Sequence, residues 1–451
     1  MNKKKYWWKE YLENDKNIIR PLDGYEYPLT MSYLAVTDIF SKFNAEDFYY
    51  CAKKNLPQIG IFNYQIKYIE KHPFWYYKKF DLIKNYNFEE IKQFEENDYG
   101  KYLQKEKISK GMDNLDPEDK SIKLTYKFEI IQINDNQTIL TMKTLHTNCD
   151  GRTIFNIFEF VRKVIDFILK NKDNKNIINN EVFLEKKEVK ICPFGQFDNY
   201  INLDKKLYQN PPDKWLEVPL RKIIPDLEIK EKTNNEEIYY INQHYVFNYK
   251  KIQDFCKKYQ ISVQAMLITM MSRATRKYYN LPEETPIYNF TPCDSRQSSL
   301  ASECLKKREF FCVSGALYPK SIGQGDLIKD LQYNYKSMKE CIPKLENIIQ
   351  IMRSSITINE ETLEFKPETR MPSYSKHACT CSSNIGRVRG NLPCFSIYLD
   401  INKENSKSDY IICFDSIHTE DNLIIMCLRP NHINKEYYNI IIEEMNQIFN
   451  L

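Results

Sequence analysis

The segment 124–169 constrains the fold most, because its hydrophobic period changes across one short turn. Four apolar residues near its start alternate with polar neighbours: Leu124, Tyr126, Phe128 and Ile130. This alternation predicts a half-buried strand, and the more apolar run 138–145, after an Asn-Asp-Asn turn, predicts its hairpin partner. From 154 to 169 the apolar residues recur at helical spacing instead, with Thr153 as the expected N-cap. The predicted order is a hairpin, a polar turn and a buried helix.

The second half of the chain follows the same plan, which indicates an α/β or α+β fold. Helical spacing predicts helices at 252–259, 263–274 and 435–449, and Ser262 is placed to cap the second. The predicted strands of this half lie at 288–290, 395–399, 410–414 and 423–428.

A chain of 451 residues is longer than most single-core domains, which suggests two lobes. Two polar, aperiodic stretches lie near its middle, at 170–176 and 230–236. We therefore expect an N-terminal lobe at 1–185, a crossover linker at 186–235 and a C-terminal lobe at 236–451.

The charge and cysteine content argue against several kinds of partner and of cellular compartment. The formal net charge is +4, and basic residues are scattered among acidic ones, which argues against a nucleic-acid partner. We expect no signal peptide and no membrane span, since lysine or asparagine interrupts every apolar stretch. Thirteen cysteines without a repeated spacing are typical of reduced thiols. A monomeric protein of the cytoplasm is expected.

The residues that point to chemistry lie in the turn between the predicted strand and helix: His146, Thr147, Asn148, Cys149, Asp150 and Gly151. Imidazole has a pKa near working pH and accepts a proton efficiently, so a histidine held here suits general-base catalysis. A glycine at 151 allows the backbone to turn tightly behind it.

The turn has three other interpretations. The histidine could be merely hydrogen-bonded at a strand end. A metal bound by His146, Cys149 and Asp150 is disfavoured, because one tight turn without a second cluster is a poor zinc signature. Cys149 as a nucleophile with His146 as its base is disfavoured too, because residues of one turn seldom point at each other.

The pattern HxxxDG, between an apolar strand and an apolar helix, resembles the active-site motif of coenzyme-A-dependent acyltransferases. This chloramphenicol acetyltransferase-like superfamily includes alcohol acetyltransferases, the plant BAHD enzymes and the condensation domains of peptide synthetases. The resemblance implies two pseudo-symmetric lobes, each a mixed β-sheet flanked by helices, with a tunnel between them. It also implies His146 as the general base and acyl-CoA as co-substrate.

The resemblance assigns roles to further residues. The family's motif aspartate is structural and pairs with an arginine, which implies this role for Asp150, although a catalytic partnership with His146 remains the other interpretation. The strand that ends at Arg296 resembles the family's strand ending in an arginine, so Arg296 is its expected partner. In a segment that resembles the family's SNxG strand, Ser383 and Asn384 are candidates to bind the oxyanion or substrate, unless they form an ordinary polar turn.

Two features depart from parts of the family. The DFGWG segment of the plant enzymes has no counterpart, since 413–418 occupies roughly its place. The doubled histidine of condensation domains is absent, because Leu145 precedes His146. His377, Cys379 and Cys381 are treated as ordinary loop residues, and no metal is expected.

The sequence thus predicts an acyltransferase that moves an acyl group from acyl-CoA to the hydroxyl or amine of a small molecule. One alternative is a condensation-type enzyme that uses a carrier-protein thioester. The other is a non-catalytic binding protein of the same fold.

Overall fold

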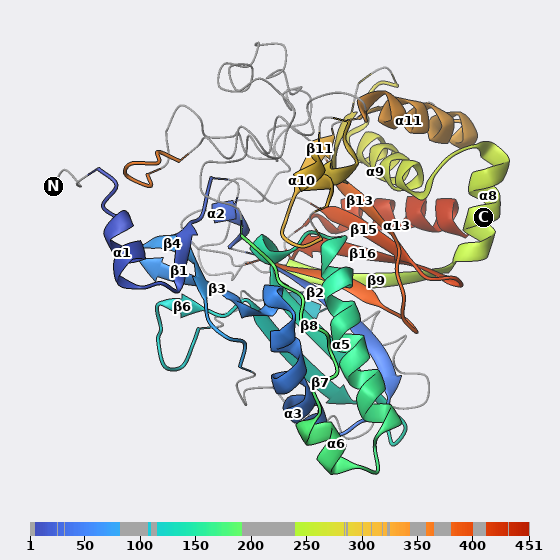
Figure 1. Ribbon diagram of the computed structural model, residues 1–451. Helices are drawn as coiled ribbons and strands as arrows, with labels where there is room; N and C mark the ends of the chain where they lie inside the picture. The colour runs from blue at the N-terminus through green and yellow to red at the C-terminus, as the bar shows by residue number, and fades with distance from the viewer. Residues whose placement is uncertain are drawn as a thin grey trace.

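The fold is described from a computed structural model of the 451-residue chain (Figure 1). The described residues are 5–24, 26–30, 32–81, 107–109, 115–191, 240–283, 285, 287–299, 301–307, 309–317, 319–322, 325–342, 358–364, 380–399, 412–431 and 433–450. Most of the predicted linker 186–235, as well as His377 and Cys379, lies outside these residues.

The first lobe is built on an antiparallel sheet of order β14-β2-β8-β7. Its strands are β2 (Ser32–Ser41), β7 (Tyr126–Gln132), β8 (Gln137–Leu145) and β14 (Cys394–Leu399). The predicted hairpin is β7 and β8, in register from Tyr126↔Thr144 to Gln132↔Thr138. Strand β8 is buried along both faces because it lies between β2 and β7 and beneath helices.

Two helices of the first lobe, α3 (Ala45–Asn55) and α5 (Thr153–Lys170), pack beside each other and on this sheet (Figure 1). Helix α5 buries the apolar stripe that the sequence predicted. The N-cap prediction was wrong: α5 begins at Thr153, and the carboxylate of Asp150 accepts the N–H groups of Arg152 and Thr153 at 3.1 and 2.8 Å. A negatively charged carboxylate interacts more favourably than a neutral hydroxyl with the partial positive charge at the N-terminus of a helix.

A smaller antiparallel sheet of order β1-β4-β3-β6 flanks the first lobe. It contains β1 (Ile18–Pro21), β3 (Tyr64–Ile69), β4 (His72–Tyr77) and β6 (Ile122–Lys123). The short helices of this half are α1 (Lys9–Asn14), α2 (Glu26–Leu29) and α6 (Lys175–Asn180).

The second lobe contains a mixed sheet of order β11-β10-β13-β15-β16-β9-β5. Its strands are β5 (Lys107–Ser109), β9 (Tyr240–Asn248), β10 (Ile287–Asp294), β11 (Ser314–Leu317), β13 (Thr380–Arg387), β15 (Cys413–His418) and β16 (Asn422–Pro430), and β12 (Lys320–Ser321) pairs with β10. The pairs β10–β13 and β13–β15 are parallel. The other pairs of this sheet are antiparallel.

The helices of the second lobe gather on one side of its sheet (Figure 1). They are α8 (Tyr249–Tyr259), α9 (Val263–Tyr279), α11 (Leu327–Cys341) and α13 (Lys435–Phe449), and a short α10 (Glu303–Lys306) follows β10. Ser262 caps α9 as predicted, accepting the N–H of Ala265 at 3.2 Å. The final helix covers the predicted range 435–449.

Two strands are exchanged between the lobes. The predicted strand 395–399 is β14, and it pairs with β2 of the first lobe instead of extending the second-lobe sheet. Conversely, β5 from the first half pairs with β9 in the second-lobe sheet. The expected lobe 236–451 therefore does not keep all of its strands in one sheet, because strand pairing is decided by non-local contacts that the chain order does not reveal.

One hydrophobic core runs from the first-lobe sheet to the facing side of the second-lobe sheet, since it joins α5 residues to Phe311, Cys381 and Cys413. The lobes are thus packed against each other next to the predicted active-site turn. Among the helices that can be described, none combines the length and apolar character needed to cross a membrane.

Candidate active site

His146 begins the 3-10 turn η3 (His146–Asn148), directly after the last residue of β8. Its Nδ1 lies 2.8 Å from the carbonyl oxygen of Cys149. A carbonyl only accepts, so Nδ1 carries the hydrogen and Nε2 is left to take a proton. The side chain keeps part of its surface exposed although protein atoms surround the ring. This tautomer is the one that a general base at Nε2 requires.

Asp150 makes contacts to both lobes. Its Oδ1 accepts from the N–H groups at the start of α5 and from the Thr153 hydroxyl at 3.0 Å. Its Oδ2 accepts from Arg296 Nη2 at 2.8 Å and from the Val313 N–H at 3.3 Å. Among the described residues these are the hydrogen-bond partners of the carboxylate, and His146 is not one of them. This geometry fits the structural role rather than a catalytic partnership.

Arg296 comes from the 3-10 turn η6 (Ser295–Gln297), which follows β10. Its guanidinium joins Asp150 to Asp294, whose Oδ1 lies 2.8 Å from Nε. The side chains of Arg296 and Asp150 are only 10% and 3% exposed. A nearly dry ion pair of this kind depends strongly on both partners, because either charge alone would be buried without compensation.

Gly151 serves a purpose other than a special backbone angle, since it is not among the glycines with positive φ. A Cβ at this position would lie 3.1 Å from Cδ1 and 3.2 Å from Cγ1 of Ile385, on β13 of the second lobe. The missing side chain lets the second lobe approach the motif turn closely.

The structure separates Ser383 from Asn384. In the parallel pair β13–β15, Ser383 is opposite Asp415 and Asn384 is opposite Ser416, so the two side chains lie on opposite faces of the sheet. Asn384 Oδ1 accepts from Ser416 Oγ at 3.2 Å and from the Gly386 N–H at 3.1 Å. It lines a surface hollow of about 690 Å³ that His146 does not line. Only Ser383 shares a face with Asp415, which interacts with His146.

Cys312, which the sequence reasoning missed, forms a side-chain hydrogen bond with His146. The pKa of His146 is raised to about 9: burial, the largest influence, lowers it, but the charge and hydrogen bond of Cys312 and the backbone oxygens of His146 and Cys149 raise it by more. The two residues are 166 positions apart, and nothing near Cys312 marks it as functional, so only the fold brings the pair to notice.

Asp415 on β15 is the second residue that was missed. Its side chain is 5% exposed, and burial raises its pKa to about 7, while a hydrogen bond from Cys413 and the charge of His146 oppose this rise. Cys413 Sγ lies 3.5 Å from Asp415 Oδ2 and 3.0 Å from Cys381 Sγ. A buried carboxyl whose pKa is raised to about 7 thus lies within electrostatic range of His146.

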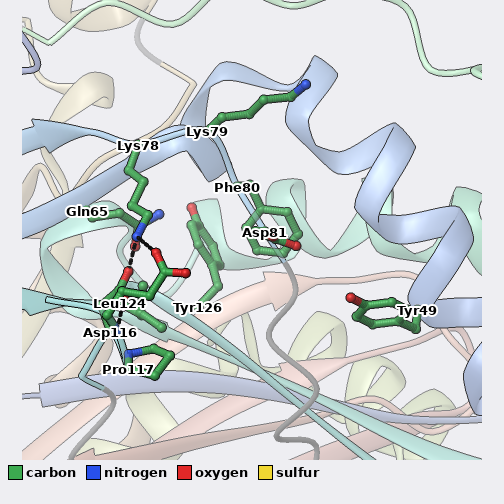
Figure 2. Close-up of a pocket in the computed structure, with 11 residues that line it drawn as sticks. Tyr49, Gln65, Lys78, Lys79, Phe80, Asp81, Asp116, Pro117, Leu124 and Tyr126 are labelled. Atoms are coloured by element: carbon green, nitrogen blue, oxygen red, sulfur yellow. Dashed lines mark hydrogen bonds and ion pairs between the residues drawn. The ribbon is translucent and has the colours of Figure 1, made fainter.

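A second cavity, of about 260 Å³, lies within the first lobe and is lined by Lys78, Asp116 and Tyr126 among others (Figure 2). Figure 2 shows the Lys78 ammonium directed at Asp116, with which it forms an ion pair. Asp116 also accepts the N–H groups of Glu118 and Asp119. The charges of Lys78 and Asp116 are therefore satisfied within the protein, and His146 does not line this cavity. Within the described ranges no group of three or more His, Cys, Asp or Glu side chains is arranged to hold a metal.

Comparison with known proteins gives a likeness in structure alone. No family model and no curated protein matches the sequence. Polyketide synthase associated protein 5 from Mycobacterium tuberculosis matches with a TM-score of 0.59 and 10% identity, over 96% of this chain and 98% of that one. A trichothecene 15-O-acetyltransferase from Fusarium sporotrichioides matches with a TM-score of 0.58 and 10% identity, over 95% of each chain. The starter condensation domain of rhizomide synthetase, in a complex with C8-CoA and Leu-SNAC, matches with a TM-score of 0.55 and 10% identity, over 96% of this chain and 93% of that one.

Proposed function

This chain has the two-lobed fold of chloramphenicol acetyltransferase-like acyltransferases and condensation domains, and we propose that it is an acyltransferase. The acyl group would move from acyl-CoA to the hydroxyl or amine of a small acceptor, with His146 as the general base. The full-length fold likeness to an acetyltransferase and to a domain in complex with C8-CoA supports this donor and this reaction.

The observation that carries the proposal is the tautomer and position of His146. The Cys149 carbonyl fixes the hydrogen on Nδ1, and the ring stands at the end of a buried strand beside the second lobe. In the neutral form of the ring, which gains population as the pH approaches its raised pKa of about 9, Nε2 accepts the proton of an attacking hydroxyl or amine and returns it to the leaving thiolate. The Asp150–Arg296 ion pair holds the turn on which this ring is placed.

We expect His146→Ala to lower product formation by about 10²–10⁴-fold, because the acceptor would lose its base. The assay is mass spectrometry of products after mixing acetyl, malonyl or long-chain CoA thioesters with a panel of alcohols and amines. The circular dichroism spectrum should be unchanged, because the ring is only partly buried.

His72→Ala is the matched control, since His72 lies on the smaller sheet of the first lobe, in β4. It should keep wild-type turnover. If a folded His146→Ala variant formed product at the wild-type rate, His146 would not be the general base. Turnover with carrier-bound thioesters only would favour the condensation-type alternative, and failure of any thioester to bind would favour the non-catalytic one.

A further inference from the structure

A buried ion pair joins β1 of the smaller sheet to the short helix α2. Arg20 lies on β1, and Glu26 is the first residue of α2. The guanidinium donates to both carboxylate oxygens, from Nη1 to Oε2 at 2.7 Å and from Nη2 to Oε1 at 2.8 Å. The side chains of Arg20 and Glu26 are only 6% and 8% exposed. A bidentate pair of this kind fixes the orientation of both groups.

The carboxylate of Glu26 accepts two further hydrogen bonds. Oε2 accepts from the N–H of Asp23 at 3.1 Å, and Oε1 accepts from the indole Nε1 of Trp75 at 3.2 Å. The N–H of Glu26 donates in return to Asp23 Oδ1 at 2.9 Å, so the first turn of α2 is closed by a reciprocal pair of bonds. The indole of Trp75 is thus bonded to a carboxylate that Arg20 and Asp23 hold in place.

Trp75 links this carboxylate to the motif turn. It is fully buried on β4, and its ring packs edge-on against Phe311 with 5.5 Å between the ring centroids. The N–H of Phe311 donates to the carbonyl of Asn148, in η3, at 2.8 Å. Cα atoms of α2 also lie within 8 Å of Cα atoms of η3. Glu26 is therefore connected to the turn of His146 both by the aromatic contact and by the packing of α2.

The backbone of Phe311 depends on this packing. Its φ of 70° lies in the left-handed region that a bulky side chain rarely adopts. Such a conformation persists only where the surrounding structure enforces it. The ring of Trp75 and the bond to Asn148 supply that enforcement, so a displaced Trp75 would let Phe311 relax and withdraw its N–H from the turn.

The ion pair contributes a fixed geometry more than it contributes stability. Taking two charges out of water is costly, and apolar residues of similar volume often stabilise a fold equally well. A catalytic side chain, in contrast, must be held within about 0.5 Å of its productive position by neighbours that are themselves fixed. A bidentate pair with further donors meets that requirement.

We propose that Glu26 is a positioning residue for the general base: by holding Trp75 and α2 it fixes the turn that orients the imidazole of His146. This inference deepens the proposed acyltransferase function and rests on it. Glu26 takes no part in the proton transfer. Loss of its bond to Trp75 should slow the chemical step and leave donor binding unchanged, because the orientation of the base matters only when the acceptor attacks.

Trp75→Phe tests the link, since it removes the indole N–H and keeps an aromatic ring beside Phe311. With a donor and acceptor that the wild type converts, we expect kcat to fall about 10- to 100-fold and KM for the acyl-CoA to stay within about twofold. Trp8→Phe is the matched control and should keep the wild-type kcat. Trp8 is 6% exposed and donates its indole N–H to the Glu360 carbonyl at 2.9 Å, within a separate apolar cluster.

Two double variants keep the proposal testable if Trp75→Phe folds poorly. Both contain Arg20→Met, which removes the buried charge that would otherwise lose its partner. Combined with Glu26→Gln, an acceptor for the Trp75 indole remains, and kcat should stay within about threefold of the wild type. Combined with Glu26→Leu, that acceptor is lost, and kcat should fall by about tenfold or more at an unchanged KM. Hydrogen exchange of the Phe311 amide should be faster in the Leu variant than in the Gln variant.

The outcomes separate this proposal from the proposed function. A folded Trp75→Phe variant with the wild-type kcat would overturn the positioning role and leave the acyltransferase proposal intact. Equal kcat and equal Phe311 amide exchange in the two double variants would do the same. A wild type that forms no product across the donor panel would overturn the acyltransferase proposal, and Glu26 would then have no base to position.

Discussion

At the scale of single residues, the carboxylate of Asp150 connects helix α5, the turn of His146 and the second lobe. It accepts from the start of α5 through Oδ1, and from Arg296 and Val313 through Oδ2. The charge is largely shielded from water, so its favourable energy depends on these donors. Loss of Arg296 would leave Oδ2 with a single neutral backbone donor.

We predict that Arg296→Met lowers the free energy of unfolding by about 3–5 kcal/mol, because it leaves a buried carboxylate without its charged partner. The double variant Asp150→Asn with Arg296→Met should lose less than the sum of the two single variants. Urea denaturation followed by fluorescence measures both. Arg387→Met is the control, since that side chain is 72% exposed. An unchanged denaturation midpoint for Arg296→Met would contradict the role given to the pair.

Site residues that stand close together in the sequence could be predicted, whereas those that only the fold brings together could not. His146, Asp150 and Gly151 stand in one short motif, and Arg296 was found by its place after a strand. Cys312 and Asp415 stand in no motif, because only the packing of the two lobes brings them to His146. Ser383 and Asn384 are adjacent in the sequence, yet strand alternation puts them on opposite faces of β13.

At the scale of elements, β14 is the strand that ties the lobes together. Its whole length pairs with β2 of the first lobe, while side chains of β9 in the second lobe bond to its backbone. His244 Nε2 lies 2.8 Å from the Phe395 carbonyl, and Asn242 Nδ2 donates to the Ile397 carbonyl at 2.9 Å. Both side chains are fully buried, so these bonds join two sheets without water.

The elements that sequence periodicity predicted best are those whose signal is local. The helix 435–449 is found as predicted, because its apolar stripe faces the core over its whole length. Strand 395–399 also exists, but its pairing with β2 was not predicted, because β-pairing depends on residues that are hundreds of positions away. A local pattern identifies a strand without identifying its neighbour.

We predict that Asn242→Ala lowers the free energy of unfolding by about 1–3 kcal/mol, since it leaves a partly buried carbonyl of β14 without that donor and opens space in the core. Amide hydrogen exchange in β14 should accelerate more than exchange in β7, which Asn242 does not contact. Asn446→Ala, at an exposed position on α13, is the matched control and should change neither quantity. Equal stability of Asn242→Ala and the wild type would mean that the strand exchange needs no such bond.

At the scale of the whole molecule, the packing of the two lobes buries titratable groups that would be solvated in the unfolded chain. Asp415 interacts electrostatically with His146 at this junction, and it lies beside the thiol of Cys413 and opposite Ser383 in the paired strand. Burial raises the pKa of Asp415 from 3.8 to about 7. The folded protein therefore holds a proton on Asp415 over a pH range in which the unfolded chain releases it.

The sign of the resulting pH dependence follows from linkage. A carboxyl whose pKa is raised on folding contributes stability that is present below its unfolded pKa and lost as the pH rises through the folded pKa. For Asp415 the loss falls between about pH 4 and pH 7, and it amounts to at most about 4 kcal/mol. Asp415→Asn cannot titrate, so its free energy of unfolding relative to the wild type should rise steadily from pH 4 to pH 7 and then level off. Urea denaturation at half-unit pH steps measures this difference, with the exposed Asp173→Asn as a flat control. A difference for Asp415→Asn that is equally flat would show that the carboxyl is solvated, and that the two lobes do not close over it as the structure has them.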